Sequence, residues 1–153
     1  MAALLAVDAG LRTGLALFDR DGRLAWCRSH NLGTPARLKK AAARILFELP
    51  DLEFLVVEGG GRLAAIWEHA ATRRHIPCLV VQADTWRGAF LLPRERVGGQ
   101  EAKAAACRLV ARLLRDEDRL LPTAPRHDAA EAVLIGSWAV ATLGWRPLPR
   151  LRT

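Results

Sequence analysis

Short apolar runs, each closed by a turn signal, alternate along this chain with longer segments of helical periodicity, and this alternation limits the possible folds most strongly. Residues 3–8 form an apolar run that ends at Asp8 and is followed by Gly10, which is typical of a buried strand. Residues 15–18 and 24–28 flank a turn of Asp, Arg, Asp and Gly, and this pattern predicts a hairpin. The three runs together predict three antiparallel strands.

The remainder of the chain predicts two more strands and four helices. Thr34 and Pro35 open a helix that runs to about Leu49 and is followed by Pro50. The other elements are expected as strand 54–57, helix 63–74, strand 78–82, helix 100–115 and helix 128–143. This order predicts an α/β fold with a mixed five-stranded sheet, in which three antiparallel strands precede parallel strands joined by helical crossovers. Because there is no internal repeat or composition break, residues 1–153 are predicted to form a single domain.

The composition indicates a basic globular protein. The formal net charge is +7, and only three of the 23 basic residues are lysines, namely Lys39, Lys40 and Lys103. A basic, arginine-rich domain attracts polyanions and suits phosphate contacts, although a GC-rich genome also produces such a composition.

Location and redox chemistry are predicted from what the sequence lacks. No apolar run approaches the roughly 18–20 residues needed to span a bilayer, so no membrane association is expected. The N-terminus has no basic flank of the kind that signal peptides carry, and a cytoplasmic location is therefore expected. Cys27, Cys78 and Cys107 form no C-x-x-C pair or zinc-ligand spacing and are interpreted as reduced packing residues.

Four acidic residues stand where a metal site would need them. Asp8 ends the first strand, and Glu58 ends a strand that a right-handed crossover can place beside it. Asp128 and Glu131 lie three residues apart at a helix start, so both point to one side. Clustered carboxylates need a cation, and oxygen-only ligands favour Mg²⁺, with Mn²⁺ as a substitute. Two such ions can activate a water and stabilise the leaving oxygen of a phosphodiester.

Each acid also has an interpretation that requires no metal. Asp8 and Glu58 are also explained as residues that mark the exit from a strand. Asp128 as an N-cap with Glu131 at the third helical position would form a capping box. The metal-site hypothesis depends on the combination of the four residues rather than on any one of them.

The motifs resemble those of RuvC-type Holliday-junction resolvases. Residues 8–14 are similar to that family's opening D-x-G-x-x-x-G, Glu58 matches its second acid, and residues 127–132 resemble its closing acid-x-x-acid-Ala helix start. The resemblance implies an RNase H-like fold, a homodimer, Mg²⁺ dependence and paired nicks across a four-way DNA junction. It departs from the family in having Glu131 where better-known members carry Asp. The loop after Glu58 is also short and glycine-rich, where those members have a longer loop with an aromatic residue.

Further residues are assigned on the same hypothesis. Trp67 and Trp86 are candidates for stacking on a base, although core packing is the commoner role of tryptophan. His127 is a candidate proton shuttle beside the acid pair. A homodimer is also suggested by the apolar stretch Leu63 to Ala71. The nucleic-acid-binding candidates are Arg12, Arg62, Arg87, Lys103, Arg108 and Arg112, with Gly10 and Gly14 allowing the backbone near Arg12 to approach a phosphate.

The sequence thus predicts an endonuclease that acts on branched DNA, with Asp8, Glu58, Asp128 and Glu131 as catalytic metal ligands. Two alternatives stay open. One is an RNase H-like nuclease of ribosomal RNA maturation, a related family that shares the D-x-G-x-x-x-G opening. The other is a non-catalytic nucleic-acid-binding module whose acids are structural. An actin-like phosphotransferase shares this opening too, but 153 residues leave no room for its second domain.

Overall fold

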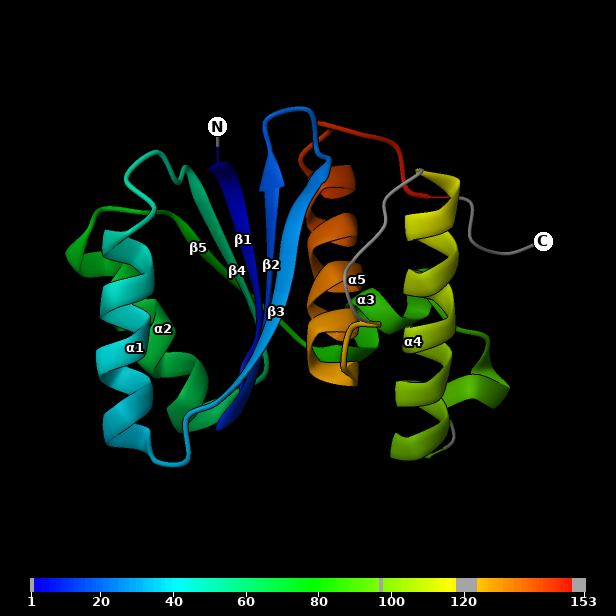
Figure 1. Cartoon of the computed structure of the whole chain (residues 1–153), viewed down its shortest axis with the longest axis horizontal. Coiled ribbons are helices and arrows are strands. Elements are labelled where there is room, and N and C mark those ends of the chain that lie inside the picture. The colour runs from blue at the N-terminus through cyan, green and yellow to red at the C-terminus, as the bar shows by residue number, and fades with distance from the viewer. Residues whose placement is uncertain (1, 97, 118–123, 150–153) are drawn as a thin grey trace.

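The computed structural model of the chain describes residues 2–96, 98–117 and 124–149. These residues form one sheet of strands β1 (Ala2–Asp8), β2 (Arg12–Asp19), β3 (Leu24–Asn31), β4 (Phe54–Glu58) and β5 (Cys78–Val81), in the order β3-β2-β1-β4-β5. The pairs β1–β2 and β2–β3 are antiparallel, while β1–β4 and β4–β5 are parallel (Figure 1). The prediction of a mixed five-stranded sheet is confirmed.

The hairpin strands are longer than predicted. β2 begins at Arg12 rather than Leu15, and β3 continues to Asn31 rather than ending at Arg28. The extra residues pair through their backbones, as Arg12 does with Asn31. The end of β3 is exposed, so its side chains carry no apolar pattern from which the strand's length could be predicted.

The helices are α1 (Pro35–Phe47), α2 (Gly61–Arg73), α3 (Ala83–Phe90), α4 (Gly99–Asp116) and α5 (His127–Thr142), with a short 3₁₀ helix η1 (Pro93–Arg96). The predicted start of α1 is confirmed, because the Thr34 hydroxyl accepts a hydrogen bond from the Arg37 amide at 3.2 Å. The helix ends two residues before the predicted Leu49. Within the described residues, no helix is both long and apolar enough to cross a membrane.

Helix α3 and η1 were not predicted. The signal for α3 is weak, since the helix has only eight residues and carries Gly88 near its end. Its only strong mark is the spacing of Trp86 and Phe90, which lie four residues apart and are both buried. This pair anchors α3 to the core that also holds α4 and α5.

The sheet has a helical layer on each face (Figure 1). Along β1, Leu5 and Val7 pack with α1 and α2, whereas Leu4 and Ala6 pack on the side of α4 and α5. Side chains alternate along a strand, so Asp8 points to the same face as Leu4 and Ala6, and Glu58 follows Val56 in the same way.

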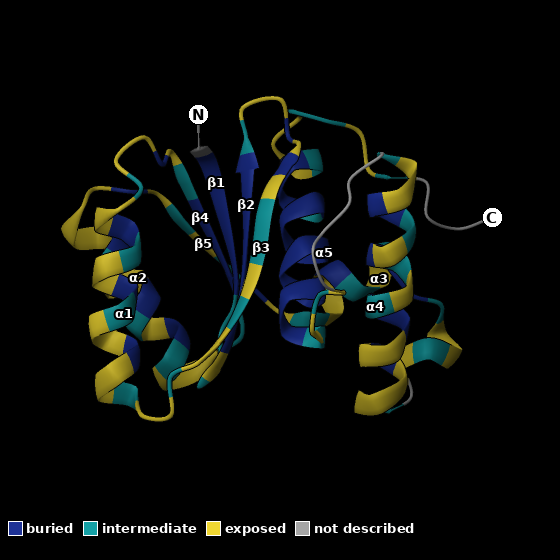
Figure 2. Cartoon of the chain, viewed as in Figure 1, coloured by how far each residue is buried: buried dark blue, intermediate teal, exposed yellow. Residues whose placement is uncertain are grey.

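Helix α5 lies between the sheet and α4 and is buried almost all round (Figure 2). Two glycines permit this close packing. A Cβ at Gly136 would lie 2.0 Å from the ring of Phe18, and a Cβ at Gly14 would lie 1.9 Å from the backbone oxygen of Asp128. Gly14 was predicted to let the backbone approach a phosphate, and this is wrong, because the space over Gly14 is filled by the first turn of α5.

Gly14→Ala should therefore destabilise the protein strongly. The added methyl meets backbone rather than a side chain that can rotate away, so the loss should exceed the about 1–3 kcal/mol typical of an overpacked core. Gly60→Ala is the matched control, because a Cβ there meets nothing within 4 Å and the residue has a φ of −122°. Urea unfolding of both variants measures the difference, and equal stabilities would mean that α5 does not rest on Gly14.

Candidate active site

The site is built on one row of residues across the sheet. In register, Ser29 of β3 pairs with Gly14 of β2, Gly14 pairs with Asp8 of β1, and Asp8 pairs with Glu58 of β4. Asp8 and Glu58 therefore stand side by side at the carboxyl ends of two parallel strands, where ligand sites of α/β sheets gather.

A hydrogen bond from a buried side chain holds the turn between β1 and β2. The Thr13 hydroxyl donates to the Gly10 carbonyl at 2.7 Å, and Thr13 is fully buried. A Cβ at Gly10 would lie 2.9 Å from the Arg12 carbonyl oxygen, so the turn leaves no room for a side chain. The two glycines of the opening motif thus have separate structural roles, Gly10 in the turn and Gly14 beneath α5.

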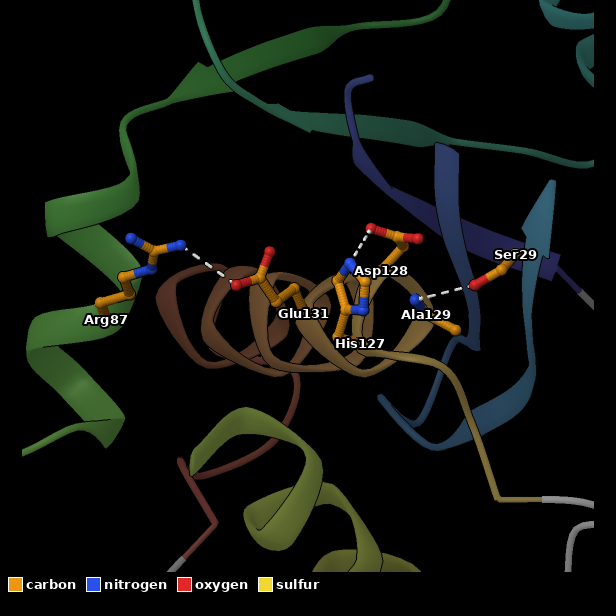
Figure 3. Close-up of polar contacts among 6 residues, drawn as sticks. All are labelled: Ser29, Arg87, His127, Asp128, Ala129 and Glu131. Atoms are coloured by element: carbon orange, nitrogen blue, oxygen red, sulfur yellow. Dashed lines mark hydrogen bonds and ion pairs between the residues drawn. The ribbon is translucent and has the colours of Figure 1, made fainter. Parts of the chain in front are cut away.

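The first turn of α5 packs against Gly14 and Ser29 of this row and completes the site. The Ser29 hydroxyl accepts a hydrogen bond from the Ala129 amide at 3.2 Å (Figure 3). The helix has Arg126 as its N-cap residue, and that side chain makes no capping bond. Ser29 therefore caps α5 from the neighbouring sheet, and the capping box of Asp128 and Glu131 is not formed. Sequence reasoning missed Ser29, because a lone serine on an exposed strand gives no signal.

Three of the four predicted acids meet. The carboxyl groups of Glu58 and Glu131 lie within hydrogen-bonding reach of Asp8. Burial, together with the negative charges of Glu131 and Glu58, raises the pKa of Asp8 to about 9. Burial also raises the pKa of Glu58, with a further contribution from Glu131, while the hydrogen bond from Asp8 and the charge of Arg87 act in the opposite direction. In the metal-free protein, burial and the neighbouring acids therefore favour a proton on Asp8.

Arg87 supplies a positive charge beside this cluster. Its Nη2 lies 3.1 Å from Glu131 Oε1 (Figure 3), and the two side chains are 24% and 7% exposed. Its Nε is buried and makes no hydrogen bond within the described part of the chain. Arg87 was predicted to bind nucleic acid, and the structure shows it paired to a site acid.

The fourth acid, Asp128, has a different neighbour. His127 Nε2 lies 3.0 Å from Asp128 Oδ1 (Figure 3), so the predicted proton-shuttle candidate does contact the acid pair. Asp128 and Glu131 also lie near Cys107 of α4. Burial and then the charge of Glu131 raise the pKa of Cys107, and Asp128 makes a smaller contribution. Cys107 thus lies near the site, although like Cys27 and Cys78 it packs beside a core cluster as expected.

Comparison with solved structures identifies the fold. The structure of Thermus thermophilus RuvC matches with a TM-score of 0.61 and 16% identity, covering 94% of this chain and 97% of that chain. T. thermophilus RuvC in complex with a Holliday junction substrate matches with a TM-score of 0.61 and 18% identity, covering 93% and 96%. The yeast mitochondrial Holliday junction resolvase Ydc2 matches with a TM-score of 0.52 and 13% identity, covering 87% and 76%.

This chain has the RNase H-like fold of RuvC. The fold expected from the motif resemblance is thereby confirmed over nearly the whole chain. No protein-family model matches the sequence, and no curated protein matches it.

The RuvC fold places the carboxylates together, and their chemistry fits a hard divalent cation. All donors are carboxylate oxygens, and the two charges that raise the pKa of Asp8 are both negative. As the side chains stand, no group of three or more His, Cys, Asp or Glu within the described residues is arranged to hold a metal ion. On donor chemistry, Asp8, Glu58 and Glu131 are the residues that would hold such a cation.

The other basic residues that were predicted to bind nucleic acid lie on β2, α2 and α4. Arg12 and Arg62 are exposed at the starts of β2 and α2, close in sequence to Asp8 and Glu58. Lys103 and Arg108 are exposed on α4, four residues before and one residue after Cys107. Arg112 is half-buried and lies 4.0 Å from Asp116.

The tryptophan predictions are resolved in favour of packing. Trp67 and Trp86 are both fully buried, so neither can stack on a base, and the stacking hypothesis is wrong for both. Trp67, Ala64 and Ala71 face the core beneath α2 rather than solvent. Within the stretch Leu63 to Ala71, Leu63 and Ile66 stay half-buried, and the homodimer stays a prediction.

The pKa of Asp8 leads to a pH prediction for the metal-free protein. Between the ordinary value of 3.8 and the folded value of about 9, the folded chain binds a proton that the unfolded chain has released. The free energy of unfolding should therefore fall as pH rises through this window. Asp8→Asn should flatten the fall, whereas Asp51→Asn, which changes an exposed aspartate, should not. Urea unfolding in chelator at pH 5 and pH 8.5 tests this, and parallel profiles for all three proteins would contradict it.

Proposed function

We propose that this chain is a Mg²⁺-dependent endonuclease that cleaves branched DNA, with four-way (Holliday) junctions as its preferred substrate. The observation that carries the proposal is the crowding of Asp8, Glu58 and Glu131 at the carboxyl ends of β1 and β4 in an RNase H-like fold. Burying like-charged acids together is costly unless a cation or a proton compensates them. A purely structural site would gain nothing from this arrangement.

Divalent cations, Mg²⁺ or Mn²⁺, would supply activation of a water and stabilisation of the leaving oxygen when bound. The chain's own residues hold and orient the acids. β1 and β4 fix Asp8 and Glu58 side by side, and Ser29 and Gly14 fix the first turn of α5 and thereby Glu131. His127 is proposed as the proton shuttle, since it contacts Asp128 and is one-third exposed.

We propose that Arg87 interacts both with the acids of the site and with a phosphate of the substrate. Without a cation it neutralises Glu131, and its charge lowers the pKa of Glu58. Its partly exposed guanidinium has more donors than the hydrogen bond to Glu131 uses, so it can bind a phosphate beside the acids. We propose that Arg12, Arg62, Lys103, Arg108 and Arg112 bind the DNA backbone further out.

The four-way junction is proposed as substrate because the T. thermophilus RuvC with this fold was solved with one. Structured RNA is the alternative substrate, since the RNase H-like fold and its opening motif are shared with nucleases of ribosomal RNA maturation. We also propose a cytoplasmic location.

Asp8→Asn tests the nuclease assignment. Asparagine keeps the shape but removes the charge, so cleavage of a four-way junction in Mg²⁺ should fall by roughly a hundredfold or more, equivalent to about 2.7 kcal/mol of barrier. Binding measured by gel shift should be unchanged or slightly tighter, because an anion near phosphates is lost. Asp51→Asn is the control and should cut like the parent.

The outcomes of this assay separate the alternatives. Undiminished cleavage by Asp8→Asn would show that the acids are not the nuclease site. Cleavage of a structured RNA in preference to the junction would favour the RNA-processing alternative. Binding of either substrate without Mg²⁺-dependent cleavage by the parent protein would favour a non-catalytic module.

Arg108 and Arg112 of α4 should make junction binding sensitive to salt. Removing one arginine that neutralises a DNA phosphate should reduce the slope of log affinity against log salt by about 0.9. Arg108→Ala combined with Arg112→Ala should therefore reduce the slope by up to about 2. The control is the pair Arg37→Ala and Lys40→Ala, which changes exposed residues of α1 on the opposite face of the sheet. Equal slopes for both double variants would mean that α4 faces away from the DNA.

A homodimer belongs to this proposal, because paired nicks in a two-fold junction need two sites related by a two-fold axis. Sedimentation velocity at micromolar concentration, with and without junction DNA, should show a dimer in at least one of the two conditions. A monomer in both would rule out paired nicking by one assembly.

A further inference from the structure

A cavity between α1 and α2 lies on the face of the sheet opposite the carboxylates. Its volume is about 340 Å³, which is in the range of sites that hold a small ligand or a few side chains. Its apolar lining consists of Ala43 and Phe47 of α1 with Ile66 and Ala70 of α2. Phe47 is 70% exposed, the highest value among the large hydrophobic residues that the structure describes. An occupant that covered this ring would remove substantial apolar surface from water.

The rim of the cavity is basic. Lys39, His69, Arg73 and Arg74 line it, and no acidic side chain of the described residues does. The Arg74 guanidinium lies over the Phe47 ring, 5.5 Å from its centre, so positive charge stands directly beside the exposed aromatic surface. The site therefore suits an occupant that combines negative charge with a large apolar group.

The cavity is remote from the acids. Helices α1 and α2 start near the edge of the sheet at which β1 and β4 end, and they run away from that edge (Figure 1). Phe47 and Arg73 are the last residues of these two helices, whereas Asp8 and Glu58 are the last residues of the two strands. The whole α1–α2 layer packs on the face that Asp8 does not point to. An occupant of the cavity is thus separate from a strand bound at the carboxylates.

Two other occupants fit less well. A second copy of this chain, related by a two-fold axis through the cavity, would bring Lys39 and Arg73 toward their own counterparts, and like charges oppose such contacts. Single-stranded nucleic acid needs a basic groove with successive stacking rings. Here the positive charges surround a hollow with one ring.

We propose that this cavity docks an acidic peptide segment of a partner protein. The segment inserts one large apolar side chain between α1 and α2, against Phe47 and Ile66, and places carboxylates against Lys39, Arg73 and Arg74. The cavity would tether the partner while the opposite face of the sheet stays open to its substrate.

The test uses a short fluorescein-labelled peptide of aspartates flanking one phenylalanine, with fluorescence anisotropy as the readout. A second peptide with serine in place of phenylalanine should bind at least about tenfold more weakly, because it loses the burial of an aromatic ring. Lys39→Glu and Phe47→Ser should each weaken binding of the phenylalanine peptide about tenfold. Lys40→Glu, an exposed neighbour that does not line the cavity, should change it less than about twofold.

Several results would overturn the proposal. Equal affinity for the two peptides, or equal effects of Lys39→Glu and Lys40→Glu, would reduce the interaction to general attraction by a basic protein. Binding of an oligothymidylate that follows the same variant ranking, with no binding of the peptide, would assign the cavity to nucleic acid. Asp8→Asn should bind the peptide like the parent, so failure of the nuclease proposal leaves this result unaffected.

Discussion

The backbone of α5 rests directly on the backbone of β2 at Gly14, and the rest of the structure depends on this contact. Because no side chain separates them, the first turn of α5 comes close enough for Ser29 to cap it and for Glu131 to reach Asp8. A methyl group at position 14 would hold the helix away from the sheet. The distance between the carboxylates of the last helix and those of the sheet is thus set by a residue that carries no chemistry.

The site works against the stability of the chain. Asp8, Glu58 and Glu131 are half-buried or buried near one another, and burial and mutual repulsion favour the protonated form of Asp8. Arg87 offsets only part of this, because it pairs with Glu131 alone among the described acids. The two apolar clusters on the faces of the sheet supply the stability that allows the acids to be held so close. Such a local cost, maintained by the surrounding core, is typical of functional sites.

Much of this arrangement was predictable from the sequence, because it follows from short-range patterns. Alternation along β1 and β4 fixes the face on which Asp8 and Glu58 lie, and the crossover rule makes the two strands neighbours. The resemblance of residues 8–14 and 127–132 to the RuvC motifs also predicted that the start of α5 belongs to the site. No short-range pattern could predict the contact of Gly14 with Asp128 or the cap from Ser29, because the partners are a hundred or more residues apart and neither pair has a distinctive sequence.

The errors have a common physical origin. Trp67 and Trp86 were considered for stacking because tryptophan suits both cores and nucleic acids, and only the tertiary packing decides between them. Helix α3 was missed because it is short, and with it the placement of Arg87, which only that helix brings to Glu131. The spacing of Trp86 and Phe90 was the available signal for the helix, but it gave no indication of an acidic partner for Arg87.

The position of α5 in the chain has a consequence for biosynthesis. This helix contacts β1, β2, β3, β4, α3 and α4, yet it is the last helix that the structure describes. While a ribosome is still making residues 127–142, the strands already made lack the element that covers one of their faces. The nascent chain must therefore keep an apolar sheet surface exposed until these residues are made, and such an exposed surface favours aggregation. The same order has a protective side, because the carboxylates of β1 and β4 cannot meet those of α5 until residues 127–142 are made, so chains that stop before them cannot assemble the site.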